Sequence, residues 1–363
     1  MMHSRHERVC VSRMVAAALG LCACLAPLCA GTQGDPAVPM ILPEPVQTVL
    51  LRDAGLTPGQ LVLVRNGQLM VKVIKSPDPQ EVAVAGAVRV AISKEEFFAR
   101  YRDIERFKRH KAVRQLGRFS SPPSMGDVAK LSFAPDSIDD LRDCRPGHCQ
   151  VKLPDAWIQD IRRGIDFTAA SWRETAQHLL RQKLVDYVTA YESAGTSALV
   201  EYHDDRVPVR LADKFAGIVA RSSYLEHTFP ALRHFLLNYP RADVEVIDSF
   251  VYWSHEEFGL KPVVSITHVA VYQDPRQPGA IVGVSKQIFA SHYLESSLGF
   301  TMAVDDGNLE KAGIYLVYIN RSIADALQGS FGGIRRSMVF NRTKDGVEQT
   351  LRELKTTLES GAR

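Results

Sequence analysis

The stretch EVAVAGAVRVAISKEEFFARYRDIERFKRH, residues 81–110, decides the fold. Its first part, 81–92, carries apolar residues at both odd and even positions, which predicts a β-strand covered on both faces. Ser93 is a typical helix N-cap, and Glu96 stands three residues later, as in a capping box. Beyond this cap, apolar residues recur with helical spacing at Phe97, Tyr101, Ile104 and Phe107. We therefore expect a buried strand followed directly by an amphipathic helix.

The segments on either side of this stretch are rich in strand-forming residues. Before it, LVLVRNGQLMVKVI (61–74) has two β-rich arms around a central Asn-Gly, which predicts a hairpin in an ordered region that starts near Val49. After it, residues 112–119 and 128–133 predict two short strands separated by a Ser/Pro/Gly-rich loop.

The second half of the chain first looks helical and then returns to strands. From Pro154 to about Tyr239, apolar residues recur with helical spacing, which predicts a helical block. After Asp243 strand patterns alternate with turn signals, and the chain ends in a helix that starts near Ser330 or Gly332. One face of this last helix carries Val347, Leu351, Leu354 and Leu358. Its polar side carries the (i, i+4) charge pairs Glu348–Arg352 and Lys355–Glu359.

This order of elements resembles the helix-grip fold of START-like proteins, the lipid-transfer and polyketide-cyclase group. The resemblance is topological, covers residues 81–152 and 241–360, and is strongest in residues 88–110. It implies an α+β fold in which a curved antiparallel sheet grips the C-terminal helix and leaves an elongated apolar cavity. The helical block is then a large insertion, and the 61–74 hairpin is an N-terminal addition. The chain as a whole also resembles a group of exported bacterial proteins, which implies no activity.

The first thirty residues predict export. Three Arg precede the apolar run MVAAALGLCACLAPLCA, as in a signal peptide, and the run is short for a membrane span. We expect cleavage after Ala30 and a periplasmic location, with lipidation at Cys24 as the alternative. The predicted organisation is a signal peptide (1–30), a linker (31–48), the hairpin with the first half of the helix-grip-like domain (49–153), the helical insertion (154–240) and the second half with the C-terminal helix (241–363).

Removal of this leader changes the charge and the cysteine content. The leader holds three of the 44 basic and one of the 41 acidic residues, so the formal charge falls from +3 to +1. This leaves no basic excess that would indicate a nucleic-acid partner. Four of the six cysteines lie in the leader, and the remaining Cys144 and Cys149 predict a disulfide. Their spacing and the Pro-Gly turn between them disfavour haem attachment, a zinc site and a redox pair.

Polar and aromatic side chains concentrate in residues 249–293. His268 lies in an otherwise apolar strand, and strict alternation places Lys286 and His292 on one face of the following strand. If that face lines a cavity, one ammonium and two imidazoles could hold the anionic head of an apolar ligand or support acid–base chemistry. The alternative is that the histidines are ordinary core or surface residues and that Lys286 faces water. The candidate ligand-binding residues are Trp253, His268, Lys286, His292 and Tyr293.

None of the motifs for metal binding or nucleophilic catalysis meets its own spacing rule. His255 lacks a second His four residues later, and Ser285 lacks the glycines of a nucleophile elbow. Residues 203–205 (His-Asp-Asp) could bind a metal but are more typical of a polar break between helices. Arg335 and Arg336 at a helix start could bind an anion, but such pairs are more often exposed. We therefore expect no metal and no cofactor.

These observations favour an exported, non-enzymatic binding protein for a hydrophobic or amphipathic, lipid-like molecule held between the sheet and the last helix. Peripheral membrane association is compatible with this role, and the oligomeric state is left open. A second hypothesis is an enzyme of the same fold that uses His268, Lys286 or His292 in acid–base or hydrolytic chemistry. A third is an envelope interaction protein whose helices in 154–240 dock a partner, which a large exposed apolar patch would support.

Overall fold

Eight strands form one antiparallel sheet in the computed structural model of the protein, which describes residues 41–109, 111–257, 261–308, 312–327 and 332–361. The side chains of residues 326, 332–336 and 338 lie outside this description. The strands are β1 (Met70–Ile74), β2 (Glu81–Val90), β3 (Val113–Arg118), β6 (Asp248–Glu256), β7 (Val263–Tyr272), β8 (Ala280–Ala290), β9 (Leu294–Asp305) and β10 (Ile314–Ala324). Their order in the sheet is β1-β2-β10-β9-β8-β7-β6-β3. The first strand of the decisive stretch, β2, therefore lies beside the last strand of the chain.

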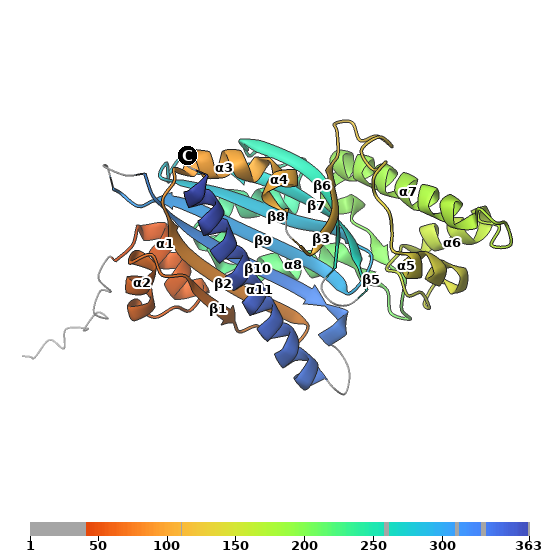
Figure 1. Cartoon of the computed structure of the whole chain (residues 1–363), viewed down its shortest axis with the longest axis horizontal. Coiled ribbons are helices and arrows are strands. Elements are labelled where there is room, and N and C mark those ends of the chain that lie inside the picture. Colours follow the sequence, from red (N-terminus) through yellow and green to blue (C-terminus); the bar gives the residue numbers. More distant parts are fainter. Residues whose placement is uncertain (1–40, 110, 258–260, 309–311, 328–331, 362–363) are drawn as a thin grey trace, which may run out of the picture. The chain divides into compact units, whose positions relative to one another are not determined.

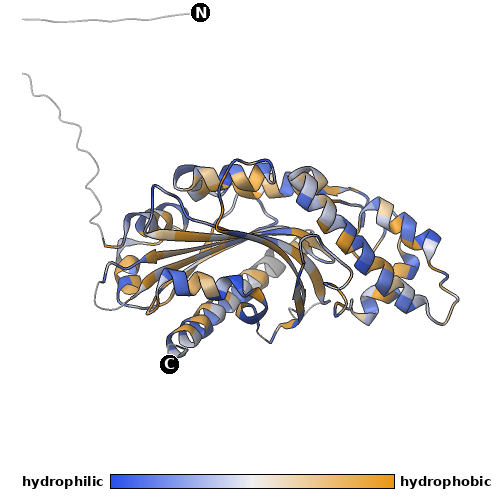
Figure 2. Ribbon diagram, turned by 90° about the horizontal axis from the view of Figure 1, so that it is seen from above, coloured by the Kyte–Doolittle hydropathy of each residue, from blue (hydrophilic) through white to orange (hydrophobic). Residues whose placement is uncertain are grey.

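Helices cover both faces of this sheet (Figures 1 and 2). They are α1 (Glu44–Thr48), α2 (Pro58–Arg65), α3 (Lys94–Arg102), α4 (Ile104–Phe107), α5 (Pro135–Asp139), α6 (Asp155–Gly164), α7 (Trp172–Ala194), α8 (Leu211–Ala220), α9 (Ser223–His227), α10 (Pro230–Asn238) and α11 (Gly332–Ser360). The face that packs against α3, α4 and α11 is called the inner face here, and the opposite face is called the outer face. The fold is α+β, with a curved antiparallel sheet, a long C-terminal helix and a helical insertion, as predicted.

Two glycines let helices approach the inner face closely. A Cβ atom at Gly86 of β2 would lie 2.3 Å from Cδ1 of Leu351 in α11. A Cβ atom at Gly283 of β8 would lie 2.8 Å from the ring of Tyr101 in α3. Any larger residue would push these helices away from the strands. As a result, α11 packs over β1 and β2, whereas α3 packs over β8 and β9.

The outer face is also buried, which explains why apolar residues occur on both parities of the strands. Side chains from α1, α2, α8, α9 and α10 form one core with the outer face of β2 and β7–β10. Side chains from α6 and α7 form a second core with β6, β7 and β8. In β2 every residue except Arg89 is buried, in agreement with the predicted two-sided cover. Burial on both faces supplies the apolar area that stabilises so large a sheet.

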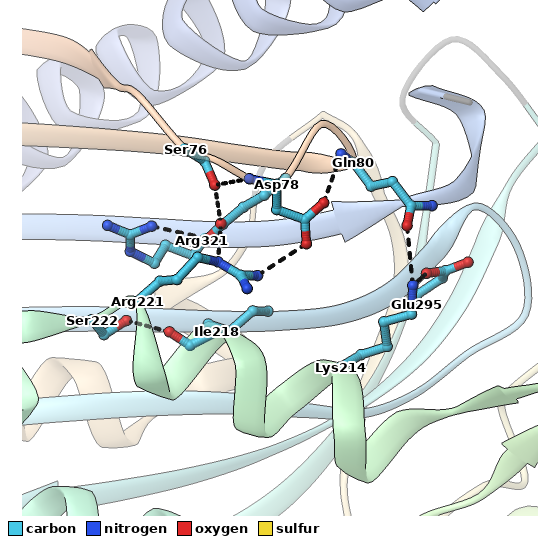
Figure 3. A network of polar contacts seen from close by, with 10 residues as sticks. Ser76, Asp78, Gln80, Lys214, Ile218, Arg221, Ser222, Glu295 and Arg321 are labelled. Atoms are coloured by element: carbon cyan, nitrogen blue, oxygen red, sulfur yellow. Dashed lines mark hydrogen bonds and ion pairs between the residues drawn. The ribbon is translucent and has the colours of Figure 1, made fainter. Parts of the chain in front are cut away.

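An ion network ties α8 to the outer face (Figure 3). The Glu81 side chain is 0% exposed, and its carboxylate accepts from Arg321 at 2.9 Å and from Arg221 of α8 at 2.5 Å. Beside it, Lys214 of α8 pairs with the buried Glu295 at 2.6 Å. Buried charges are tolerated only when such partners compensate them. The network therefore fixes the register of α8 on the sheet.

The disulfide between Cys144 and Cys149 is present, with a Cα–Cα distance of 4.4 Å. Between the two cysteines Gly147 adopts a left-handed conformation, with φ of 79°. The backbone N–H groups of Gly147 and Cys149 donate to the carbonyl oxygens of His203 (2.8 Å) and Asp204 (2.9 Å). These carbonyls lie between the two short strands β4 (Glu201–Tyr202) and β5 (Val209–Arg210). The stapled turn thus anchors the start of the helical insertion to a hairpin inside it.

Other local predictions are also confirmed. Ser93 caps α3 by accepting from the N–H of Glu96 at 3.1 Å. The helical stripe that follows is broken once, because the Asp103 side chain caps the separate short helix α4. In α11 the predicted (i, i+4) pairs form, Glu348–Arg352 at 2.9 Å and Lys355–Glu359 at 2.6 Å.

The predicted N-terminal hairpin in 61–74 is wrong. Its first arm is the end of α2, because Thr57 forms a capping box with Gln60 and Pro58 occupies the first helical position. The second arm is β1, which pairs with β2 instead.

Three smaller expectations also differ from the structure. Residues 128–133 form no strand, and the predicted linker already contains α1 from Glu44. The predicted helical block also contains the hairpin of β4 and β5. No helix among the described residues is long and apolar enough to cross a membrane.

Candidate functional site

Polar residues occupy alternate positions of five neighbouring strands on the inner face. Cross-strand register aligns these positions, for example Thr267 opposite Gln287, and Ser285 opposite Gly299, which in turn faces Asn320. We call this set the polar strip, and it comprises Ser254, Ser265, Thr267, Ser285, Gln287, Ser297, Thr301, Tyr318, Asn320 and Ser322. The antiparallel register thus gathers hydroxyl and amide groups from β6 to β10 on one surface.

The part of the polar strip on β8, β9 and β10 is reachable from outside the core. Five of its side chains are only partly buried, namely Ser285, Ser297, Tyr318, Asn320 and Ser322. Their neighbours on the outer face of the same strands, such as Lys286, Leu298 and Ile319, are buried. This difference is unexpected for central strands. On the inner face α11 packs over β1 and β2, whereas α3 packs over β8 and β9 at Gly283 (Figure 1). Neither helix fully covers the strip residues further along these strands.

Three of these accessible residues hydrogen-bond to one another across β9 and β10. The hydroxyls of Ser297 and Ser322 lie 2.8 Å apart. Asn320 donates from Nδ2 to Ser297 at 3.3 Å, and Ser322 donates to Asn320 Oδ1 at 2.8 Å. The three side chains hold each other in fixed orientations, while their partial exposure leaves room for further hydrogen bonds.

Gln287 adds a buried polar atom with unmet hydrogen-bonding capacity. The residue is 6% exposed, and its Oε1 atom has no hydrogen-bond partner among the described residues. A buried acceptor without a partner costs about 1–3 kcal/mol. Such a cost is tolerated most readily where a ligand or water supplies the missing donor.

The polar strip ends at an ion pair beside β6. Lys108, just after α4, pairs with Glu256, which also accepts from Ser254 at 2.6 Å. The Lys108 ammonium lies 5.2 Å from the ring centroid of Tyr252. Burial by itself would lower the pKa of Lys108, but the adjacent Glu256 carboxylate outweighs it and raises that pKa. Lys108 therefore stays charged, and its charge is compensated inside the protein.

The phenols around the strip stay protonated at neutral pH. Burial raises the pKa of Tyr318 to about 12 and raises the pKa of Tyr101 further above its usual range. Both hydroxyls can therefore donate hydrogen bonds, and neither supplies a phenolate.

His268 and Lys286 lie opposite each other on the outer face, so they do not lie between the sheet and α11. His268 hydrogen-bonds to the hydroxyls of Tyr191 (2.9 Å) and Ser249 (2.8 Å). Burial and the neighbouring Lys286 lower the pKa of His268 to about 3. Burial lowers the pKa of Lys286 to about 7. This pair is enclosed by the helical insertion, and the ring centroid of Phe215 in α8 lies 4.4 Å from the Lys286 amine.

Trp253 is also on the outer face, in the core made with α6 and α7. It is 1% exposed, its ring covers Gly117, and its indole N–H donates to the carbonyl of Asp127 at 2.9 Å. These contacts satisfy the side chain within the core, and its predicted role in ligand binding stays a prediction.

His292 and Tyr293 lie in the turn between β8 and β9, away from His268. His292 Nε2 is 2.9 Å from the hydroxyl of Ser137 in α5, and both side chains are buried. Burial lowers the pKa of His292 to about 4. Tyr293 has a positive φ of 58°, a strained conformation for a residue with a side chain, and its hydroxyl accepts from the N–H of Lys261 at 2.9 Å.

The prediction that Lys286 and His292 share a face of one strand is wrong. Ile266 pairs with Phe289 and Thr267 pairs with Gln287, so Ile288 is an extra residue that forms a bulge. The bulge breaks the alternation between the two side chains. Of the three residues proposed for acid–base chemistry, the fold brings His268 and Lys286 together and leaves His292 apart.

The polar strip is not among the predictions from the sequence, although the sequence contains a signal for it. Short polar pairs two residues apart recur in β6, β7, β8 and β10, at 254 and 256, 265 and 267, 285 and 287, and 320 and 322. A spacing of two marks one face of a strand. The sequence does not reveal that all these pairs fall on the same face, which register determines.

The motifs considered for metal binding do not assemble a site in the described part of the chain. No group of three or more His, Cys, Asp or Glu residues there could hold a metal ion. His203 instead contacts Glu201 at 2.9 Å, and Asp204 pairs with Lys152 at 3.1 Å. The side chains of Arg335 and Arg336 lie outside the described residues.

The chain was compared with known proteins by sequence and by structure. No protein-family model and no curated protein matches the sequence. Among solved structures, the chain is similar to the Zhui aromatase/cyclase from Streptomyces sp. R1128, with 14% sequence identity and a TM-score of 0.26. The match covers 39% of this chain and 86% of the other.

Proposed function

We propose that the protein binds an amphipathic small molecule on the polar strip, between α11 and α3. The observation that carries this proposal is the set of partly exposed polar side chains on β8–β10, in central strands whose other residues are mostly buried. Export to the periplasm and lipid-like character of the ligand belong to the same proposal.

Apolar side chains border the polar strip on the inner face. Partly buried apolar residues of this face are Phe107 and Leu116 near β6, and Val347 and Leu354 on α11. A ligand that bridges both kinds of surface would bury its apolar part at about 25 cal/mol per Å² and keep hydrogen bonds for its polar part. An amphipathic molecule satisfies both requirements, whereas a purely apolar molecule leaves the hydroxyl and amide groups of the strip without partners.

The proposal predicts that a bulky residue on the strip blocks binding. Ser285→Phe places an aromatic ring on the partly exposed part of the inner face, and Ser193→Phe places the same ring on the exposed side of α7 as a control. Binding of a dodecyl amphiphile, measured by isothermal titration calorimetry, should weaken at least about tenfold in the first variant only. Equal affinity in both variants would place the ligand elsewhere.

An enzyme of the same fold is the second candidate. The contact of 2.9 Å between Ser137 and His292 favours it, because a Ser–His pair is the minimum for an activated hydroxyl nucleophile. Both side chains are buried, so a substrate needs access that the described structure does not provide. Esterase activity on p-nitrophenyl esters that vanishes in both Ser137→Ala and His292→Ala would support this candidate, and activity that survives both changes would eliminate it.

A further inference from the structure

We infer that the polar strip selects a neutral head group with several hydroxyls, as in a monoacylglycerol or an alkyl glycoside, over a carboxylate or ammonium head. This inference rests on the proposed function and specifies the chemical class of its ligand. It differs from the anionic head that the sequence predicts, because the residues behind that prediction lie elsewhere in the fold.

The first support is the kind of group that the strip presents. Its accessible members on β9 and β10 are three hydroxyls and one amide, from Ser297, Tyr318, Asn320 and Ser322. Each of these groups both donates and accepts hydrogen bonds. A polyol offers the same mixture of donors and acceptors, whereas a carboxylate only accepts and an ammonium only donates.

The second support is the unpartnered oxygen of Gln287. This buried acceptor can be satisfied by a ligand that donates a hydrogen bond. A hydroxyl meets the requirement without bringing a charge into the inner face. A carboxylate would instead place negative charge against an acceptor and leave it unsatisfied.

The third support is that the charge at the β6 end of the strip is already compensated. Lys108 is paired with Glu256, and Glu256 also accepts from Ser254. A charged head at the strip would have to lose its hydration without gaining an opposite charge from this pair. A neutral head avoids that cost and exchanges hydrogen bonds to water for hydrogen bonds to the strip.

The test compares three amphiphiles that share a twelve-carbon chain and differ in the head. These are 1-monolauroylglycerol, laurate and dodecylamine, each titrated into the full-length protein by calorimetry below its micelle concentration. We expect the glycerol head to bind at least about tenfold more tightly than either charged head. Equal or tighter binding of a charged head overturns the inference and leaves the proposed function standing. If none of the three binds to folded protein, both the inference and the proposed function fail.

Variants of Gln287 locate the selectivity. Gln287→Met keeps a similar volume and removes the acceptor, so the preference for 1-monolauroylglycerol over laurate should shrink several-fold. Gln287→Glu should favour dodecylamine over laurate. Gln349→Met, on the exposed side of α11, is the matched control and should change neither ratio.

Because Gln287 is buried, its variants also need a check on folding by circular dichroism. Asn320→Leu, at a partly exposed position of the strip, provides an independent test with less risk to folding. It should reduce the same preference. An unchanged preference in both Gln287→Met and Asn320→Leu overturns the assignment of selectivity to the strip.

Discussion

Lys286 lies directly opposite His268 across β7 and β8, and both side chains point away from α11 into the helical insertion. Lys286 is 1% exposed, and among the described residues its amine hydrogen-bonds to two neutral oxygens, Thr196 Oγ1 at 3.2 Å and the Leu236 carbonyl at 3.3 Å. Leu236 lies near the end of α10, so the amine meets a carbonyl in the last turn of a helix. The helical insertion therefore covers a lysine–histidine pair, and neither side chain contacts a carboxylate among the described residues.

The stability of the protein should rise with pH above neutrality because of Lys286. Its pKa is about 7 in the folded state, against an ordinary value of 10.5. Between these values the unfolded chain binds a proton that the folded chain does not, so the free energy of unfolding increases with pH. Urea denaturation at pH 7 and pH 9.5 should show this increase, and Lys286→Met should reduce it. Parallel pH profiles for the two proteins would contradict the prediction.

Acid should destabilise the protein partly through His268. Its folded pKa of about 3 lies below the ordinary 6.5, so its contribution is complete above pH 6.5 and is lost as the pH falls toward 3. His268→Gln, which keeps hydrogen-bonding groups near Tyr191 and Ser249, should lose less stability than the parent between pH 6.5 and 4. The exposed His234→Gln is the control and should follow the parent curve.

Gly283 should be sensitive to the smallest possible enlargement. The new methyl group of Gly283→Ala would meet the rings of Tyr101 and Phe98, at 2.8 Å and 3.1 Å. Overpacking of this kind costs about 1–3 kcal/mol, which chemical denaturation can measure. Gly279→Ala, where a Cβ atom meets nothing within 4 Å, should change the free energy of unfolding by less than about 0.5 kcal/mol. A similar effect of both substitutions would show that α3 does not depend on this close approach.

Glu81 should be the most costly carboxylate to neutralise. Glu81→Gln removes the compensating charge for Arg321 and Arg221 in a buried network, so a loss of about 3–5 kcal/mol is expected. Glu348→Gln, which breaks a partly exposed pair on α11, should cost only about 0.3–0.5 kcal/mol. Thermal and urea denaturation of both variants would compare them, and near-equal losses would mean that the network does not hold α8 to the sheet.

Local sequence signals predicted most elements correctly where one interaction dominates. The Ser93 cap, the apolar stripe of α11 and the Cys144–Cys149 disulfide each depend on residues close together in the chain. The missed start of α2 also had a local signal, the Thr57 and Gln60 capping box, which the strand-like residues after it obscured. In each case the energy comes from neighbours within a few residues, so the sequence contains it directly.

The candidate site could not be predicted in the same way. A strand has two faces, and when helices bury both of them apolar residues no longer indicate which face is which. The polar strip exists because register aligns five strands, and the position of Lys286 relative to His292 depends on one extra residue, Ile288, in β8. Register and bulges are fixed by pairing between distant segments and by the packing of whole helices.

The sequence by itself therefore determined the order and type of most elements, the α+β class and the disulfide, because these follow from local hydrogen bonds, periodicity and cysteine count. Only the tertiary structure decided that His268 and Lys286 lie under the insertion and that hydroxyl and amide groups collect on the inner face. The physical reason is that a side chain's surroundings depend on which distant strands and helices pack beside it. That choice is made by the burial of the whole apolar surface.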